Sequence, residues 1–152
     1  MENPIVDKIM KEKISAEHLL YVSLKYTKTC DVILNLLRRW TIMINDSIEG
    51  LLEQLKKNKK IPAIPIAPRQ KTELIKKMFK NSPEVMKAIE IYELFKRIDN
   101  LRTIRESEFR KDVRLRIIDG DREIIVNLDT LKAYTAILES FISYVKQFLL
   151  KK

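Results

Sequence analysis

Apolar residues recur at helical spacing through most of the chain. From Ala16 to Asn58 there is no proline and only one glycine, Gly50, and two neighbouring rows of apolar side chains line one face. This spacing predicts one long helix, straight or kinked. A break between Lys28 and Asp31, with Asp31 capping a second helix, is the competing interpretation.

Capping residues and prolines mark the other helix ends. Asn3 followed by Pro4 is typical of the start of a short helix, and Ser15 is a candidate cap for the long helix. Three prolines spaced three residues apart then end the long helix and predict an extended, polyproline-like connector over residues 59–68. We expect a shorter helix over 69–80 and another from Ser82 to about Arg105.

The period changes from helical to two over residues 112–127. Apolar Val113, Leu115 and Ile117 alternate with Arg114 and Arg116, and an Asp-Gly pair follows before a second apolar run. This pattern predicts a β-hairpin. The fold class expected is therefore mainly α with one β-hairpin (α+β), a bundle of long helices in a single domain over residues 1–152.

The last segment, residues 129–151, is expected to be a closing helix capped by Asp129 or Asn127. Its apolar residues fall on two heptad positions, which is typical of a coiled coil and predicts a homo-oligomer, a dimer or higher. The face of an intramolecular bundle gives the same pattern. The residues expected to mediate oligomerisation are Leu131, Tyr134, Leu138, Phe141, Val145 and Phe148.

Composition limits the class of protein. The chain has 152 residues and one cysteine, so an internal disulfide is excluded, and it has no apolar run of the roughly 20 residues that a membrane span needs. With no visible signal peptide, we expect a cytoplasmic protein without a membrane partner. The many Lys, Ile and Glu residues are typical of thermophiles, although a biased genome gives the same usage.

The positive charge is concentrated in one segment. The net charge is +9, and residues 55–80, here called the basic segment, hold nine basic residues against Glu73, or +8. Such asymmetry is typical of proteins that bind polyanions, whereas a solvated helix end is the simpler interpretation of the lysines alone. The expected phosphate contacts are Lys56, Lys57, Lys59, Lys60, Arg69, Lys71, Lys76, Lys77 and Lys80.

Further basic and aromatic residues extend this prediction. Arg38 and Arg39, in "LRRW", and Arg114 and Arg116, on one face of the hairpin, are expected to contribute secondary contacts. Single-strand binders also offer aromatic rings on which bases stack. Five aromatic residues are candidates for this role. Phe79 and Phe109 lie inside basic runs and are expected to be exposed, whereas Trp40 and Tyr26 lie on the helical stripe and are expected to be core; Tyr21 is assigned to neither group.

No catalytic pattern is present in the sequence. His18 is the one histidine and is expected on a helix surface, while Cys30 lies on the apolar stripe and is expected to be a buried structural thiol. Two isolated glycines cannot form a phosphate-binding loop, and no Ser/His/Asp arrangement is evident. We therefore expect binding without catalysis, cofactor or metal.

The segment "ISAEHLLYVSLKYTKTCDVILNLLRRW" and the elements after it resemble the archaeal ThermoDBP-related proteins, which bind single-stranded nucleic acid. The resemblance implies a basic cleft with aromatic residues and long helices that oligomerise through coiled-coil contacts. The chain also resembles the helical HEPN domains, often RNases, whose hallmark is an Arg followed closely by a His. The candidate arginines are Arg38, Arg39, Arg97, Arg102 and Arg105, and no histidine follows any of them. This second resemblance therefore implies a non-catalytic module.

The sequence as a whole predicts a protein that binds single-stranded DNA or RNA through a basic surface with weak sequence preference. A protein–protein adaptor, docking a partner through the closing helix and the hairpin edge, is the alternative from another class. A non-catalytic HEPN-like module is the third.

Overall fold

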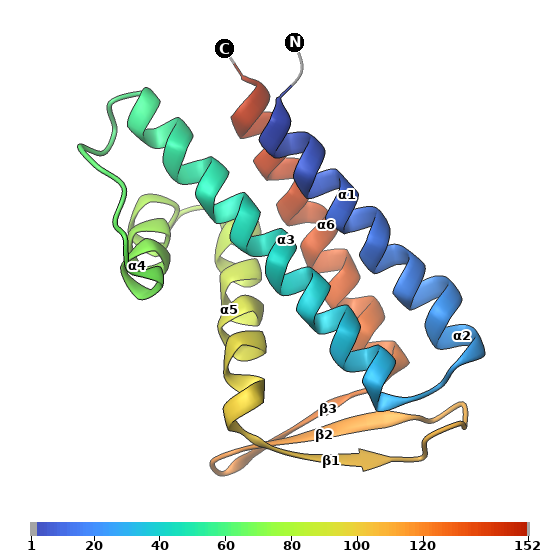
Figure 1. Cartoon of the computed structure of the whole chain (residues 1–152). Coiled ribbons are helices and arrows are strands. Elements are labelled where there is room, and N and C mark those ends of the chain that lie inside the picture. The colour runs from blue at the N-terminus through green and yellow to red at the C-terminus, as the bar shows by residue number, and fades with distance from the viewer. Residues whose placement is uncertain (1–2, 152) are drawn as a thin grey trace.

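The computed structural model describes residues 3–151. The long helices pack side by side, and a small antiparallel sheet lies across one end of the bundle (Figure 1). The predicted class, mainly α with a hairpin, is confirmed. The apolar stripes of the helices meet in one continuous core.

The chain begins with α1 (Pro4–His18), which continues through a π-helical turn (Leu19–Ser23) into the short α2 (Leu24–Tyr26). Asn3 caps α1, because its side-chain oxygen accepts hydrogen bonds from the backbone N–H groups of Ile5, at 3.0 Å, and Val6, at 3.2 Å. The helix runs through Ser15 without interruption, so the prediction that Ser15 caps a helix is wrong.

A break at residues 27–29 separates α2 from the longest helix, α3 (Cys30–Lys57). The prediction of one continuous helix from Ala16 is therefore wrong, and the competing break is correct. Thr29, rather than Asp31, caps α3, and its hydroxyl accepts from the N–H of Val32 at 3.4 Å. The break lets α1 fold back along α3, so that each helix buries its apolar stripe on the other (Figure 1).

Gly50 explains how closely the two ends of the chain approach α3. A β-carbon at this position would lie 2.9 Å from Cγ2 of Ile5 and 3.0 Å from Cδ1 of Leu149. Glycine costs stability inside a helix, but here it allows α1 and the last helix to reach the backbone of α3.

The connector after α3 leads to α4 (Pro68–Met78) and α5 (Pro83–Arg97). It bends at residues 60–62 and 66–67, so it is not a straight polyproline helix, and Ile61 is buried in the core. The helix predicted to reach Arg105 ends earlier, at Arg97, and is followed by a 3-10 turn (Ile98–Asn100).

The residues after that turn form a strand that the sequence did not predict. Strand β1 (Arg102–Glu106) pairs antiparallel with β2 (Arg114–Asp119), which pairs in turn with β3 (Arg122–Val126). The β2–β3 hairpin is confirmed, with Gly120 at φ +63° in its turn. Leu115, Ile117 and Val126 are fully buried, which shows the face that the sheet turns toward the helices.

The closing helix, α6 (Leu128–Leu150), begins at Asn127, whose side chain accepts from the N–H of Thr130 at 2.9 Å. Its heptad residues pack against other parts of the same chain. Four of them are buried, Tyr134 packs on Trp40 and Phe95, and Phe148 packs on Phe79. This seam therefore packs within the chain, which is the intramolecular interpretation of the heptad pattern, and self-association stays a prediction. The four buried residues are Leu131, Leu138, Phe141 and Val145.

Candidate nucleic-acid interface

Two basic surfaces lie at opposite ends of α3. The basic segment starts at the C-terminal end of this helix, whereas Lys25 and Lys28 precede its N-terminal end. The helix has 28 residues, so the two ends are about 42 Å apart. Figure 1 shows the connector at one end of α3, α4 on the flank of the bundle, and the loop between β1 and β2 near the other end of α3.

Two lysines of the basic segment form ion pairs that hold α4 in place. Lys71 pairs with Glu49 of α3, and Lys76 pairs with Glu93 of α5 at 2.9 Å and with Glu73 at 3.6 Å. The hydrogen bond that Lys76 donates to the carboxylate of Glu93 raises the pKa of Lys76. These two residues attach α4 to its neighbours, and their charges are already compensated.

The other basic residues of the segment are exposed and form no ion pair within residues 3–151. They are available for contacts to an anion, as the charge count suggested. These residues are Lys56, Lys57, Lys59, Lys60, Arg69, Lys77 and Lys80.

Phe79 does not join them as a stacking platform. It is 4% exposed, and its ring packs edge-on against Tyr144 at 6.0 Å and Phe148 at 5.3 Å between ring centroids. The prediction that Phe79 is exposed is wrong, because the end of α4 turns this ring into the core. The basic segment therefore offers charge without an accessible aromatic ring.

Of the two arginines on α3, only Arg39 forms an ion pair within residues 3–151, and Arg38 is exposed. Arg39 pairs with Glu12 of α1 at 3.5 Å, and Arg38 donates to the side chain of Asn35 at 3.4 Å. Trp40, next to them, is buried and stacks on Phe95, as expected of a core residue.

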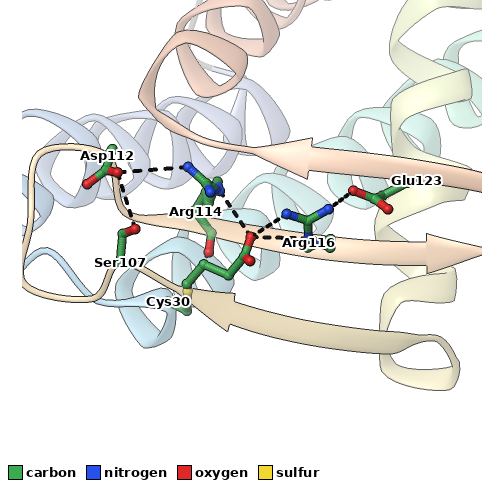
Figure 2. Close-up of polar contacts among 7 residues, drawn as sticks. Cys30, Ser107, Asp112, Arg114, Arg116 and Glu123 are labelled. Atoms are coloured by element: carbon green, nitrogen blue, oxygen red, sulfur yellow. Dashed lines mark hydrogen bonds and ion pairs between the residues drawn. The ribbon is translucent and has the colours of Figure 1, made fainter.

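Arg114 and Arg116 are held by carboxylates on the outer face of the sheet. Oε1 of Glu106 accepts from Nε of Arg114 at 3.0 Å and from Nη2 of Arg116 at 2.8 Å, and Arg116 also pairs with Glu123 (Figure 2). The hydrogen bonds from Arg116 and Arg114 lower the pKa of Glu106. Both guanidinium groups therefore stabilise the sheet and are poorly placed to meet a phosphate.

Cys30 anchors the start of α3 to this sheet. Its thiol donates to the backbone carbonyl of Arg114 at 3.2 Å, and burial raises its pKa (Figure 2). A protonated, fully buried thiol is a poor nucleophile. The interpretation of Cys30 as a structural thiol is confirmed by its burial.

The loop between β1 and β2 is docked onto the break between α2 and α3. The N–H of Phe109 donates to the carbonyl of Lys28 at 2.6 Å, and Arg105 pairs with Asp31 at 2.8 Å. Ser107 and Phe109 adopt positive φ angles of 54° and 68°. Such conformations are uncommon for residues other than glycine and often occur at functional sites.

Three aromatic rings are exposed at this end of the molecule. Tyr26 is 77% exposed, Phe109 76% and Tyr21 54%. The expectation that Phe109 is exposed is confirmed, whereas the expectation that Tyr26 is core is wrong. Tyr26 follows the π-helical turn and ends the helix, so it leaves the stripe that a regular helix would give it.

Four lysines lie at this end of the molecule beside Tyr21 or Tyr26. Lys25 lies 5.7 Å from the ring centre of Tyr26, and Lys28, Lys111 and Lys132 line one pocket together with Lys25 and Tyr21. None of the four forms an ion pair within the described part of the chain. We call this group the lysine–aromatic surface: Tyr21, Lys25, Tyr26, Lys28, Phe109, Lys111 and Lys132.

Sequence reasoning found only part of this surface. Phe109 was singled out because it lies beside Arg110 and Lys111, but Lys25, Lys28 and Lys132 occur in no charge run. The only local signal is the mixture of basic and aromatic residues in "LKYTK" and "EFRKD". These stretches are brought together by the sheet, which the sequence predicted only in part.

No family model, curated protein or solved structure matches the chain. None of the described helices is long and apolar enough to cross a bilayer. Within residues 3–151 no three His, Cys, Asp or Glu side chains are grouped so that they could hold a metal ion.

Proposed function

We propose that the protein binds single-stranded nucleic acid, DNA or RNA, with weak sequence preference. The observation that supports this most directly is the lysine–aromatic surface, where Tyr21, Tyr26 and Phe109 are exposed. Its four lysines have no carboxylate partner within residues 3–151; all four line a pocket with Tyr21, and Lys25 also lies over the ring of Tyr26. Lysines attract phosphates of any sequence, and exposed rings stack on unpaired bases of any kind.

The aromatic rings favour a single strand over a duplex. In a duplex the base faces are already stacked on each other, so only the phosphates remain for the lysines. A single strand satisfies both kinds of group at once. The basic segment, at the other end of α3, adds phosphate contacts that do not distinguish between the two.

The direct test is fluorescence anisotropy with labelled oligo(dT) and with a duplex of equal charge, at two salt concentrations. We expect oligo(dT) to bind more tightly than the duplex, and its affinity to fall steeply as salt rises. An absence of oligo(dT) binding at low salt would contradict the proposal.

A pair of double variants tests the contribution of the basic segment. Lys57→Gln with Lys60→Gln removes two exposed lysines from it, and we expect affinity to fall and the salt slope to decrease by up to about 1.4, or about 0.7 per lost phosphate contact. Lys11→Gln with Lys87→Gln removes the same charge from exposed positions elsewhere and is the control. Equal effects of the two pairs would mean that the basic segment acts only through net charge.

A further inference from the structure

A pocket opens beside the exposed rings of the lysine–aromatic surface. It lies between the π-helical turn and α2 with the break that follows them, the loop after β1, and the first turns of α6, and it encloses about 260 Å³. Its apolar lining consists of Leu20, Leu24, Val113 and Leu128. Three of these side chains are buried, whereas Leu128 is 40% exposed and lies at the edge.

The polar groups of the pocket are almost all cationic. Within the described residues its lining includes Lys25, Lys28, Lys111 and Lys132. Tyr21 is the one uncharged polar side chain among these lining residues, and no carboxylate or carboxamide side chain takes part. An apolar floor flanked by lysine side chains suits a flat ligand group that needs few specific hydrogen bonds. The same ligand should carry a negative charge on each side of that flat group, so that the lysines can pair with it.

We infer that this pocket receives one unstacked nucleobase of the bound strand, while the phosphates on either side of it contact the lysines. This inference rests on the proposed function and adds the unit that is recognised. A nucleotide within a strand has the required form, since its base has two apolar faces and is flanked by phosphates. The aliphatic floor and the ring of Tyr21 contact those faces.

The same lining explains why we expect sequence preference to be weak. Reading all the bases requires both donors and acceptors matched to their edges: Arg or Lys for guanine, Asn or Gln for adenine and a carboxylate for cytosine. The lysines donate hydrogen bonds but cannot accept them, and only the Tyr21 hydroxyl does both. The pocket therefore accepts a base by its faces and does not discriminate strongly by its edge.

The test compares labelled oligo(dT) with an abasic oligomer of the same length and charge. The substitution Leu24→Phe places a ring in the cavity without changing the charge of the protein. We expect the wild-type chain to prefer oligo(dT), and Leu24→Phe to reduce that preference by about fivefold or more, the loss of one stacked base, while the abasic oligomer binds as before. Thermal unfolding of the variant verifies that it is folded.

A second variant avoids any change in the core. Leu128→Gln makes the edge of the pocket polar, and Leu150→Gln is the matched control, because Leu150 is similarly exposed, at 49% against 40%, and lies at the far end of the same helix. We expect only Leu128→Gln to reduce the preference for oligo(dT).

The outcomes separate this inference from the proposed function. If Leu24→Phe and Leu128→Gln both keep the wild-type preference for oligo(dT), the pocket is not the base site, although single-strand binding stands. If the wild-type chain binds neither oligomer, the proposed function fails and the inference with it. An alkyl carboxylate that binds wild type but not Leu24→Phe, with oligo(dT) preference unchanged, would assign the pocket to a small amphiphile and overturn the inference.

Discussion

At the scale of single residues, Phe109 combines an unfavourable backbone conformation with a side-chain ring that is exposed to solvent. Its φ of 68° lies in the left-handed region, where a residue with a β-carbon loses roughly 1–2 kcal/mol. The hydrogen bond from its N–H to the carbonyl of Lys28 helps to hold this conformation. Because the ring is 76% exposed, it contributes little to the core in return.

Two substitutions at Phe109 separate backbone strain from ring contacts. Phe109→Gly and Phe109→Ala both remove the ring, so we expect both to weaken oligo(dT) binding equally. Only glycine relieves the positive φ, so Phe109→Gly should have a free energy of unfolding about 1 kcal/mol above that of Phe109→Ala. Chemical denaturation and anisotropy measure the two effects, and wild-type affinity in both variants would exclude the ring as a stacking platform.

At the scale of elements, the sheet depends on one carboxylate between two guanidinium groups. Glu106 lies on the edge strand β1 and joins it to β2 through Arg114 and Arg116 (Figure 2). These contacts lower the pKa of Glu106, so the ionised carboxylate is favoured in the folded protein. The stabilisation is present above the unfolded pKa of the group and is lost as pH falls through its lowered folded pKa.

Substituting Glu106 should therefore have an effect that depends on pH. We expect Glu106→Gln to have a lower Tm than the wild-type chain at neutral pH. The difference should shrink as the pH falls below the unfolded pKa of a glutamate, about 4.3, because the wild-type chain then gains a proton on unfolding. Glu53→Gln, at an exposed residue without an ion pair in the described chain, is the control. A difference in Tm that stays constant down to pH 3 would contradict this role.

Elements whose signals are local could be predicted from the sequence. The caps Asn3 and Asn127 and the turn at Gly120 act within a few residues, and the structure contains all three. Strand β1 was missed because it exists through its pairing with β2, and nothing within Arg102–Glu106 distinguishes it from the end of the preceding helix. The break before α3 is similar, since it is stabilised by the return of α1 along α3.

Candidate sites follow the same rule. The excess charge of the basic segment could be counted from neighbouring residues, but the ion pairs of Lys71 and Lys76 depend on Glu49 and Glu93, which lie on other helices. The lysine–aromatic surface combines residues from three separate stretches of the chain. Only a folded structure shows which cations remain free and which rings are exposed.

At the scale of the whole molecule, the closing helix α6 is an interior element. Leu138 is 2% exposed and lies in the seam that was expected to pair with a second copy. Because this seam is filled by the chain itself, the stability of the fold should not depend on a partner.

A core substitution tests this. We expect Leu138→Ala to lower the free energy of unfolding by about 2–5 kcal/mol, as large-to-small core substitutions do. The Tm of the wild-type chain and of the variant should also be the same at protein concentrations tenfold apart. A Tm that rises with concentration in the wild type, and no longer does so in the variant, would show that the seam pairs between copies.

The length of α3 has a consequence for stoichiometry. The two basic surfaces are separated by about the length of this helix, roughly 42 Å for its 28 residues. An oligomer too short to cross that distance meets two independent sites, so one chain can bind two such oligomers. A strand that reaches both ends binds as a bivalent ligand, and its second contact forms at the high effective concentration set by the first. The length of α3 thus sets the minimum length of nucleic acid that can occupy both surfaces at once and so bind with higher affinity than either surface alone provides.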